Sequence, residues 1–144
     1  MYELDLVVFD MAGTTVRATD QVPAAFQEAF GHVGVTLSED EIQSVRGRSK
    51  REAISDLLTR HLSAGDERRL APGIYDDFQH MLIARYKEHG VESVDGADDT
   101  IEWLKAHDVK VALSTGFDRV VADLLVHMVG WDQSIDVVVC NNDV

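Results

Sequence analysis

Short, continuously apolar runs alternate along the chain with longer amphipathic stretches. The first run, Leu6–Phe9, is rich in β-branched residues and predicts a strand buried on both faces, as in parallel sheets. Similar runs predict strands over 109–114 and 135–140. Apolar residues at helical spacing lie on either side of the second run, over 96–107 and 120–128. This alternation predicts an α/β layer with a parallel sheet of three strands.

The segment after the first strand has helical spacing instead, with no strand signal between successive helices. Its predicted helices begin near Pro23, Ser38, Ser49 and Pro72, and the last continues to about His89. Ser38 and Ser49 are predicted N-caps, because a serine hydroxyl can accept a bond from a free amide of the first turn. We therefore expect two domains: an α/β core of 1–16 and 92–144, and an all-helical insertion of 17–91.

Composition narrows the class of protein. The 144 residues include 26 acidic and 13 basic side chains, for a formal net charge of −13. This charge argues against nucleic acid and anionic membranes as partners. The single cysteine, Cys140, cannot form an intramolecular disulfide and is expected to be a small buried hydrophobe. The first residues do not resemble a signal peptide, and no apolar run approaches the ~20 residues of a membrane span. We expect a cytoplasmic globular protein.

Polar residues follow two of the predicted strands. Asp10 ends the first strand, and Ser114, Thr115 and Gly116 end the second. Ligands of doubly wound sheets bind at the carboxyl ends of the strands. A carboxylate can attack phosphorus, and a hydroxyl with free amides can hold phosphoryl oxygens. The simpler alternative for Asp10 alone is a strand-ending turn or cap. The pairing of both strand ends favours phosphate chemistry.

A basic cluster stands out in the helical segment. It holds four of the 13 basic residues within six positions: Arg46, Arg48, Lys50 and Arg51. Cations at a helix N-terminus oppose the macrodipole at a cost of about 0.3–1 kcal/mol each, which an anionic ligand can offset. A neutral lysine amine could also attack a carbonyl carbon. The alternative is a solvated basic edge, which we favour for Arg51.

Residues 8–16, with Asp10-Met11-Ala12-Gly13-Thr14-Thr15 at their centre, resemble the first motif of the haloacid dehalogenase superfamily. Their form is typical of its phosphonoacetaldehyde hydrolase (phosphonatase)-like branch. The resemblance extends over the chain and implies a Rossmann-like core with an inserted helical cap. It implies that Asp10 is the nucleophile and a magnesium ligand. The backbone carbonyl of Ala12 would be a second magnesium ligand.

Ala12 is the most specific residue in this resemblance. Most phosphatases of the superfamily have an aspartate there, which protonates the leaving alcohol; alanine cannot transfer a proton. The resemblance therefore implies a carbon leaving group. Gly47-Arg48-Ser49-Lys50 is similar to the Gly-x-x-Lys segment of phosphonatase caps, whose lysine forms a Schiff base with the substrate aldehyde. By that resemblance Lys50 is catalytic, and Arg46, Gly47 and Arg48 belong to the substrate site.

The resulting hypothesis is magnesium-dependent C–P cleavage of phosphonoacetaldehyde, with Ser114, Thr115 and Gly116 binding the phosphoryl group. Three residues depart from the phosphonatase pattern and leave a related 2-oxoalkylphosphonate equally open: Arg46, Ala53 and Phe117, which replace Met, His and Tyr. Two further alternatives remain. The first is a phosphatase of the same superfamily acting on a small phosphate ester. The second is an inactive fragment or protein-binding remnant.

The resemblance places the superfamily's third and fourth motifs after the last residues of the chain. We therefore expect the chain to be the N-terminal part of a longer hydrolase. That view also predicts an open edge along the first strand and an uncovered apolar sheet face. An apolar edge strand is a template for pairing with another chain. A homodimer or other self-association is expected.

Overall fold

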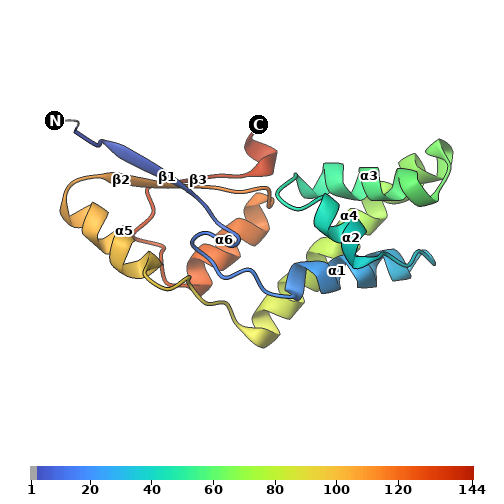
Figure 1. The fold of residues 1–144 in the computed structure, drawn as a ribbon, viewed down its shortest axis with the longest axis horizontal. Coiled ribbons are helices and arrows are strands. Elements are labelled where there is room, and N and C mark those ends of the chain that lie inside the picture. The colour runs from blue at the N-terminus through green and yellow to red at the C-terminus, as the bar shows by residue number, and fades with distance from the viewer. Residues whose placement is uncertain (1–2) are drawn as a thin grey trace. The chain divides into compact units, whose positions relative to one another are not determined.

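The computed structural model describes residues 3–144, which form two compact units. One unit comprises the chain up to Ala18 together with Gly90–Val144, and the other is Thr19–His89. The first unit is a sheet with helices, and the second is entirely helical (Figure 1). An α/β layer with a helical insertion after its first strand is therefore confirmed.

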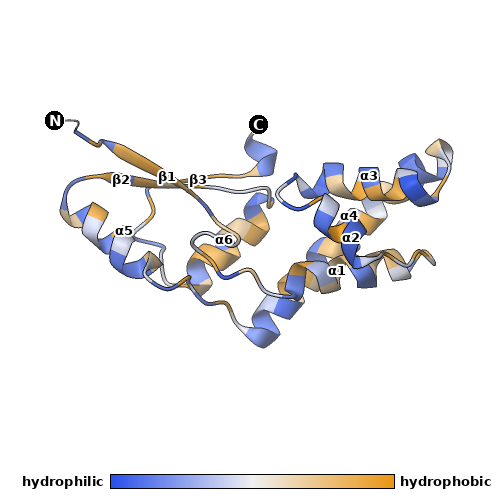
Figure 2. Cartoon of the chain, in the orientation of Figure 1, coloured by the Kyte–Doolittle hydropathy of each residue, from blue (hydrophilic) through white to orange (hydrophobic). Residues whose placement is uncertain are grey.

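The sheet has three parallel strands in the order β1–β2–β3. They are β1 (Leu6–Asp10), β2 (Lys110–Ser114) and β3 (Val137–Val139). β1 and β2 are strongly hydrophobic (Figure 2). The central strand is the best buried, with Val111, Ala112 and Leu113 all at most 3% exposed. β3 is shorter than the predicted 135–140, because Ile135 belongs to a turn and the Cys140 amide bonds the Asp143 side chain.

Two helices of this unit, α5 (Ala97–Ala106) and α6 (Arg119–Met128), lie on the same side of the three strands (Figure 1). Their apolar faces are buried, including Ile101, Leu104, Val121 and Leu125. The register aligns Val8 of β1 with Ala112 and Val137, so these side chains share one sheet face. Val8 is 56% exposed and Val137 is 50% exposed. Helices of the described residues therefore cover one face, and the prediction that Leu6–Phe9 is buried on both faces is wrong.

The helical unit consists of α1 (Gln21–Gly31), α2 (Glu39–Ser44), α3 (Lys50–His61) and α4 (Ala64–His89). The rings of Phe26 and Phe78 lie 4.5 Å apart between centroids and join α1 to α4. Both predicted serine caps are present. Ser38 forms a reciprocal capping box with Glu41, and the hydroxyl of Ser49 accepts a bond from the amide of Glu52.

Helix α4 begins eight residues earlier than the sequence pattern predicts, and Pro72 lies inside it rather than in its first turn. Its start is stabilised by Ser63, whose hydroxyl accepts a bond from the Asp66 amide at 3.3 Å. Proline inside a helix removes one backbone hydrogen bond, and its ring crowds the carbonyl four residues earlier. The packing of α4 against α1 and α3 outweighs that loss. In the described part of the chain, no helix is both long and apolar enough to cross a membrane.

Candidate active site

The two polar strand ends meet at one edge of the sheet. Asp10 is the last residue of β1 and is the register partner of Ser114, the last residue of β2. Neighbouring strands lie about 4.8 Å apart, so the two backbones are adjacent. Both residues are exposed. Ser114 is in turn paired with Val139 of β3, which brings the third strand end to the same edge.

The loop after β1 is a tight turn built around one carbonyl. The amides of Thr14, Thr15 and Val16 all donate to the carbonyl of Met11, at 2.9–3.1 Å. Gly13 has φ +86°, a left-handed conformation that glycine adopts without strain. Met11 is fully buried, which anchors the turn in the core. The exposed tip then consists of Ala12, Gly13 and Thr14.

Two threonines of this turn contact the candidate nucleophile. The hydroxyl of Thr15 is buried and donates to the backbone carbonyl of Asp10 at 2.9 Å. The hydroxyl of Thr14 lies 3.5 Å from a carboxylate oxygen of Asp10. Thr15 therefore fixes the backbone at the strand end, while the Asp10 carboxylate remains exposed. Such a group can act as a nucleophile or as a metal ligand.

The chain after β2 leads directly into the N-terminus of α6. The amide of Thr115 donates to the Val139 carbonyl at 3.0 Å, and its hydroxyl accepts a bond from the Phe117 amide at 3.2 Å. Phe117 is buried and closes the turn. Ser114, Thr115 and Gly116 therefore stand before a helix N-terminus, where amides and the macrodipole favour anions.

The structure brings further polar residues to this edge that the sequence pattern did not single out. Arg119 donates to the Val138 carbonyl at 2.8 Å and pairs with Asp143 of the short 3-10 helix η1 (Asn141–Asp143). Asn141 donates to the carboxylate of Asp118, the N-cap residue of α6, at 3.3 Å. Asp118 could have been predicted from the sequence as a helix N-cap, because it is an aspartate directly before an apolar helix. Arg119 and Asp143 are 24 residues apart in the sequence, so no local sequence pattern predicts that they pair.

Cys140 follows β3 and is 1% exposed. Burial raises the pKa of the Cys140 thiol; the Arg119 charge lowers it by a smaller amount, and the nearby carboxylates raise it again. A buried thiol that stays protonated is a poor nucleophile. The expectation that Cys140 is a small buried hydrophobe is confirmed by this burial.

The basic cluster lies in the helical unit, on the turn between α2 and α3 and on the first turn of α3. Gly47 has φ +80° at the centre of this turn. The Arg48 guanidinium lies 3.2 Å from the Asp56 carboxylate, and the Lys50 amine donates to the Arg48 carbonyl at 3.3 Å. Arg46 is exposed, and its backbone amide donates to Gln43 at 3.1 Å.

Arg51, expected as a solvated residue, has its guanidinium 4.0 Å from the centre of the Tyr75 ring. That cation–π contact makes Arg51 part of the packing between α3 and α4. Lys50 belongs to the helical unit and Asp10 to the α/β unit. Their meeting in one active site stays a prediction.

The groups at the end of β1 include oxygen atoms of the kind that bind magnesium. The ligands available are the exposed Asp10 carboxylate and the Ala12 carbonyl; the amides of the turn bond to other carbonyls, those of Met11 and Val16. Magnesium prefers oxygen ligands and is commonly held by one or two carboxylates, substrate phosphate and water. Residues 3–144 contain no group of three or more His, Cys, Asp or Glu side chains that could hold a metal on their own.

Residues 7–144 match the family of haloacid dehalogenase-like hydrolases, and the chain belongs to that family. Among curated proteins, it is 29% identical to phosphonoacetaldehyde hydrolase of Paraburkholderia phytofirmans, over 99% of this chain and 57% of that protein. It is 30% identical to phosphonoacetaldehyde hydrolase of Lactiplantibacillus plantarum, over 78% of this chain and 46% of that protein. The chain therefore spans about half the length of these relatives.

Solved structures share the fold at lower identity. A phosphonoacetaldehyde hydrolase-like protein from Oleispira antarctica is 22% identical, with a TM-score of 0.79 over 98% of this chain and 54% of that one. A mutant of CbbY from Rhodobacter sphaeroides, in complex with xylulose-1,5-bisphosphate, is 19% identical, with a TM-score of 0.83 over 99% of this chain and 65% of that one. These likenesses confirm the haloacid dehalogenase-like fold of a parallel sheet with helices.

Proposed function

We propose that this chain carries the nucleophile and the Schiff-base lysine of a phosphonatase-like hydrolase. The reaction is the cleavage of the C–P bond of phosphonoacetaldehyde or a related 2-oxoalkylphosphonate. The observation that carries the proposal is the register of Asp10 with Ser114, beside a turn in which Ala12 occupies the exposed tip. This edge supplies a nucleophile and phosphoryl ligands without a general acid on the turn. The identity to curated phosphonoacetaldehyde hydrolases supports the same substrate class.

The first step belongs to Lys50. Its neutral amine attacks the aldehyde carbon, a C–N bond forms, and the carbonyl oxygen leaves as water, with one proton taken up from solvent and returned when the imine is hydrolysed at the end of the cycle. The product is a protonated imine between Lys50 and the substrate. This imine withdraws electrons from the carbon that bears the phosphonate group. Carbon thereby becomes a leaving group that needs no proton, which is consistent with alanine at position 12.

The second step transfers the phosphoryl group to Asp10. A carboxylate oxygen attacks phosphorus, the O–P bond forms and the C–P bond breaks, and its electron pair moves to the imine nitrogen to give an enamine. Ser114 and Thr115 hold the phosphoryl oxygens through their hydroxyl groups, and Gly116 holds them through its amide. The position of these three residues before the N-terminus of α6 supports that role.

Water completes the cycle at both sites. It hydrolyses the aspartyl phosphate, which releases phosphate and restores the Asp10 carboxylate. The enamine takes a proton on carbon, and water then releases acetaldehyde and frees the Lys50 amine. A bound magnesium ion, held by the Asp10 carboxylate and the Ala12 carbonyl, would neutralise charge on the phosphoryl oxygens. The net reaction consumes one water per C–P bond.

Product analysis tests the proposal. Phosphonoacetaldehyde should yield phosphate and acetaldehyde in equal amounts, and Lys50→Arg should abolish both products. Lys87→Arg is the matched control, because Lys87 is an exposed lysine of α4 in the same unit. A phosphatase needs no imine, so release of phosphate from phosphate esters with no effect of Lys50→Arg would contradict the proposal.

A further inference from the structure

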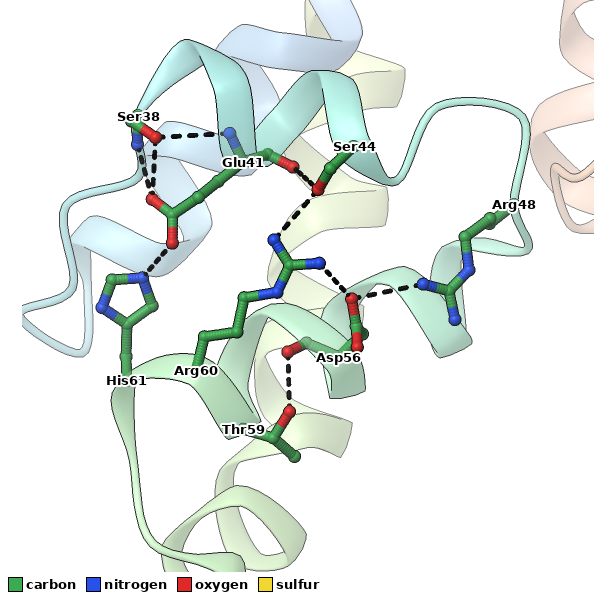
Figure 3. A network of polar contacts seen from close by, with 8 residues as sticks. All are labelled: Ser38, Glu41, Ser44, Arg48, Asp56, Thr59, Arg60 and His61. Atoms are coloured by element: carbon green, nitrogen blue, oxygen red, sulfur yellow. Dashed lines mark hydrogen bonds and ion pairs between the residues drawn. The ribbon is translucent and has the colours of Figure 1, made fainter.

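Four polar side chains link the two ends of the turn between α2 and α3 (Figure 3). We call them the polar clasp: Ser44, Arg48, Asp56 and Arg60. Arg60 donates to the Ser44 hydroxyl at 3.0 Å and to the Asp56 carboxylate at 2.6 Å. The same carboxylate oxygen accepts a bond from Arg48 at 3.2 Å. The clasp therefore runs from the last residue of α2, across α3, to the residue just after Gly47.

The backbone of the turn that the clasp closes is held by local hydrogen bonds. Its backbone bonds are short-range, from the amide of Arg46 to Gln43 and from the amide of Arg48 to Val45. Gly47 takes a left-handed conformation at its tip, and glycine carries the largest conformational freedom of any residue. The side chain of Val45 is buried at one end, while Arg46, Gly47 and Arg48 are exposed. The Arg48–Asp56 contact thus links the far side of the turn to the middle of α3.

The Lys50 amine is connected to this contact through one residue. Its Nζ donates to the backbone carbonyl of Arg48 at 3.3 Å, while the Arg48 side chain bonds Asp56. The direction of that carbonyl depends on the conformation of residues 47–49. Asp56 therefore holds the Arg48 side chain through a hydrogen bond, and the Arg48 backbone carbonyl accepts a hydrogen bond from the Lys50 amine.

We propose that Asp56 is a positioning residue that holds the Lys50 amine ready for attack on the substrate carbonyl, through Arg48. The proposal rests on the Schiff-base role of Lys50 described above. It gives Arg48 a structural role within the helical unit, which is to hold the turn between α2 and α3. Small errors in the placement of a reacting group lower rates strongly, so loss of the clasp should slow imine formation. The pairs are partly exposed, and such pairs contribute little to folding.

The test is the rate at which borohydride traps Lys50 in the presence of phosphonoacetaldehyde. Asp56→Asn should lower the trapping rate at saturating substrate by roughly tenfold, within the range expected for a misplaced group. The substrate concentration giving half the maximal rate should change little, because Asp56 does not touch the substrate. Asp56→Glu, which keeps the charge, should recover most of the rate. Asp76→Asn is the matched control, since Asp76 is an exposed aspartate of α4 in the same unit.

Arg48→Gln breaks the same contact from its other end and replaces Asp56→Asn if that variant does not fold. Where both single variants fold, the double variant should be no slower than Asp56→Asn, because Arg48→Gln removes only the contact with Asp56 that Asp56→Asn also removes. Additive losses, or an Asp56→Asn variant as fast as the unmodified chain, would overturn the positioning role and leave the Schiff base intact. Absence of trapping in the unmodified chain would instead contradict the proposed function itself.

Discussion

Asp10 and Ser114 are register partners at the last paired positions of β1 and β2, so the two strands end together. One strand end carries a carboxylate and the other a hydroxyl followed by glycine. The turn after Asp10 is fixed by three amides on the Met11 carbonyl, which leaves Ala12 at the exposed tip. This arrangement places an exposed carboxylate, a serine hydroxyl and a residue with no acid function at one edge of the sheet.

Asp10→Asn should separate the two halves of the reaction. The amide is close in size to the carboxylate and is a far weaker nucleophile, so phosphate release from phosphonoacetaldehyde should fall by at least about a thousandfold. Borohydride trapping of Lys50 should persist, because imine formation does not involve the phosphoryl group. Phosphate release that survives the substitution would show that another residue attacks phosphorus.

Ala12→Asp should add the missing acid. A positioned general acid contributes about 10²–10⁴ to a rate, and we expect hydrolysis of a simple alkyl phosphate to rise toward the lower end of that range. Ala12→Asn is the control, because asparagine has the same shape and cannot protonate the leaving oxygen. Equal activity in both variants would mean that the absence of an acid at position 12 does not determine the leaving group.

Much of the structure at this edge of the sheet could be predicted from the sequence alone. Apolar runs located β1 and β2, and the rule that parallel strands end at one edge brought Asp10 to Ser114. The hydrophobic pattern did not predict features that depend on residues far apart in the sequence, namely which sheet face is buried and which side chains meet. Leu6–Phe9 has the composition of a strand buried on both faces, yet α5 and α6 lie on the same side. The contacts of Arg48 with Asp56 and of Arg119 with Asp143 depend on side-chain geometry over 8 and 24 residues, which periodicity does not record.

The exposed apolar sheet face should cause self-association. Val8 is 56% exposed and Val137 is 50% exposed on this face. In addition, β1 is an edge strand of the described sheet, where another strand could pair with it. We expect the chain to form dimers or larger species at high concentration and to bind an apolar dye. Val8→Thr with Val137→Thr should reduce both, because threonine keeps the β-branched shape and adds a polar group.

The control for that prediction is Val120→Thr, since Val120 is 62% exposed but lies on α6. Sedimentation analysis of the three proteins distinguishes the outcomes. A monomeric chain at high concentration, with cooperative unfolding and no dye binding, would contradict a role for this face in association.

Stability should fall on the acid side of neutrality. The Ser38 backbone and then His61 hold the pKa of Glu41 below its ordinary value of 4.5 by hydrogen bonding. Lys105 and then the Val111 amide hold the pKa of Asp136 below 3.8 in the same way. A carboxyl whose pKa is lower in the folded state stabilises the fold above its unfolded pKa, and this stabilisation disappears as the pH falls through the folded pKa.

The free energy of unfolding should therefore decrease as the pH falls below about 4.5. Urea unfolding at pH 7, 5 and 3 measures this change. Asp136→Asn should be less stable than the unmodified chain at pH 7 and should lose less stability between pH 5 and 3. Equal slopes for both proteins would show that the bonds to Lys105 and Val111 do not stabilise the ionised carboxylate.

Identifying the lysine that borohydride traps tests the role of Lys50 most directly. The chain is incubated with phosphonoacetaldehyde and borohydride, digested, and mapped by mass spectrometry. The Schiff-base role of Lys50 predicts a substrate-derived, reduced adduct on Lys50 that is lost in Lys50→Arg and retained in Lys87→Arg. An adduct on other lysines alone, or none at all while phosphate is released, would contradict it.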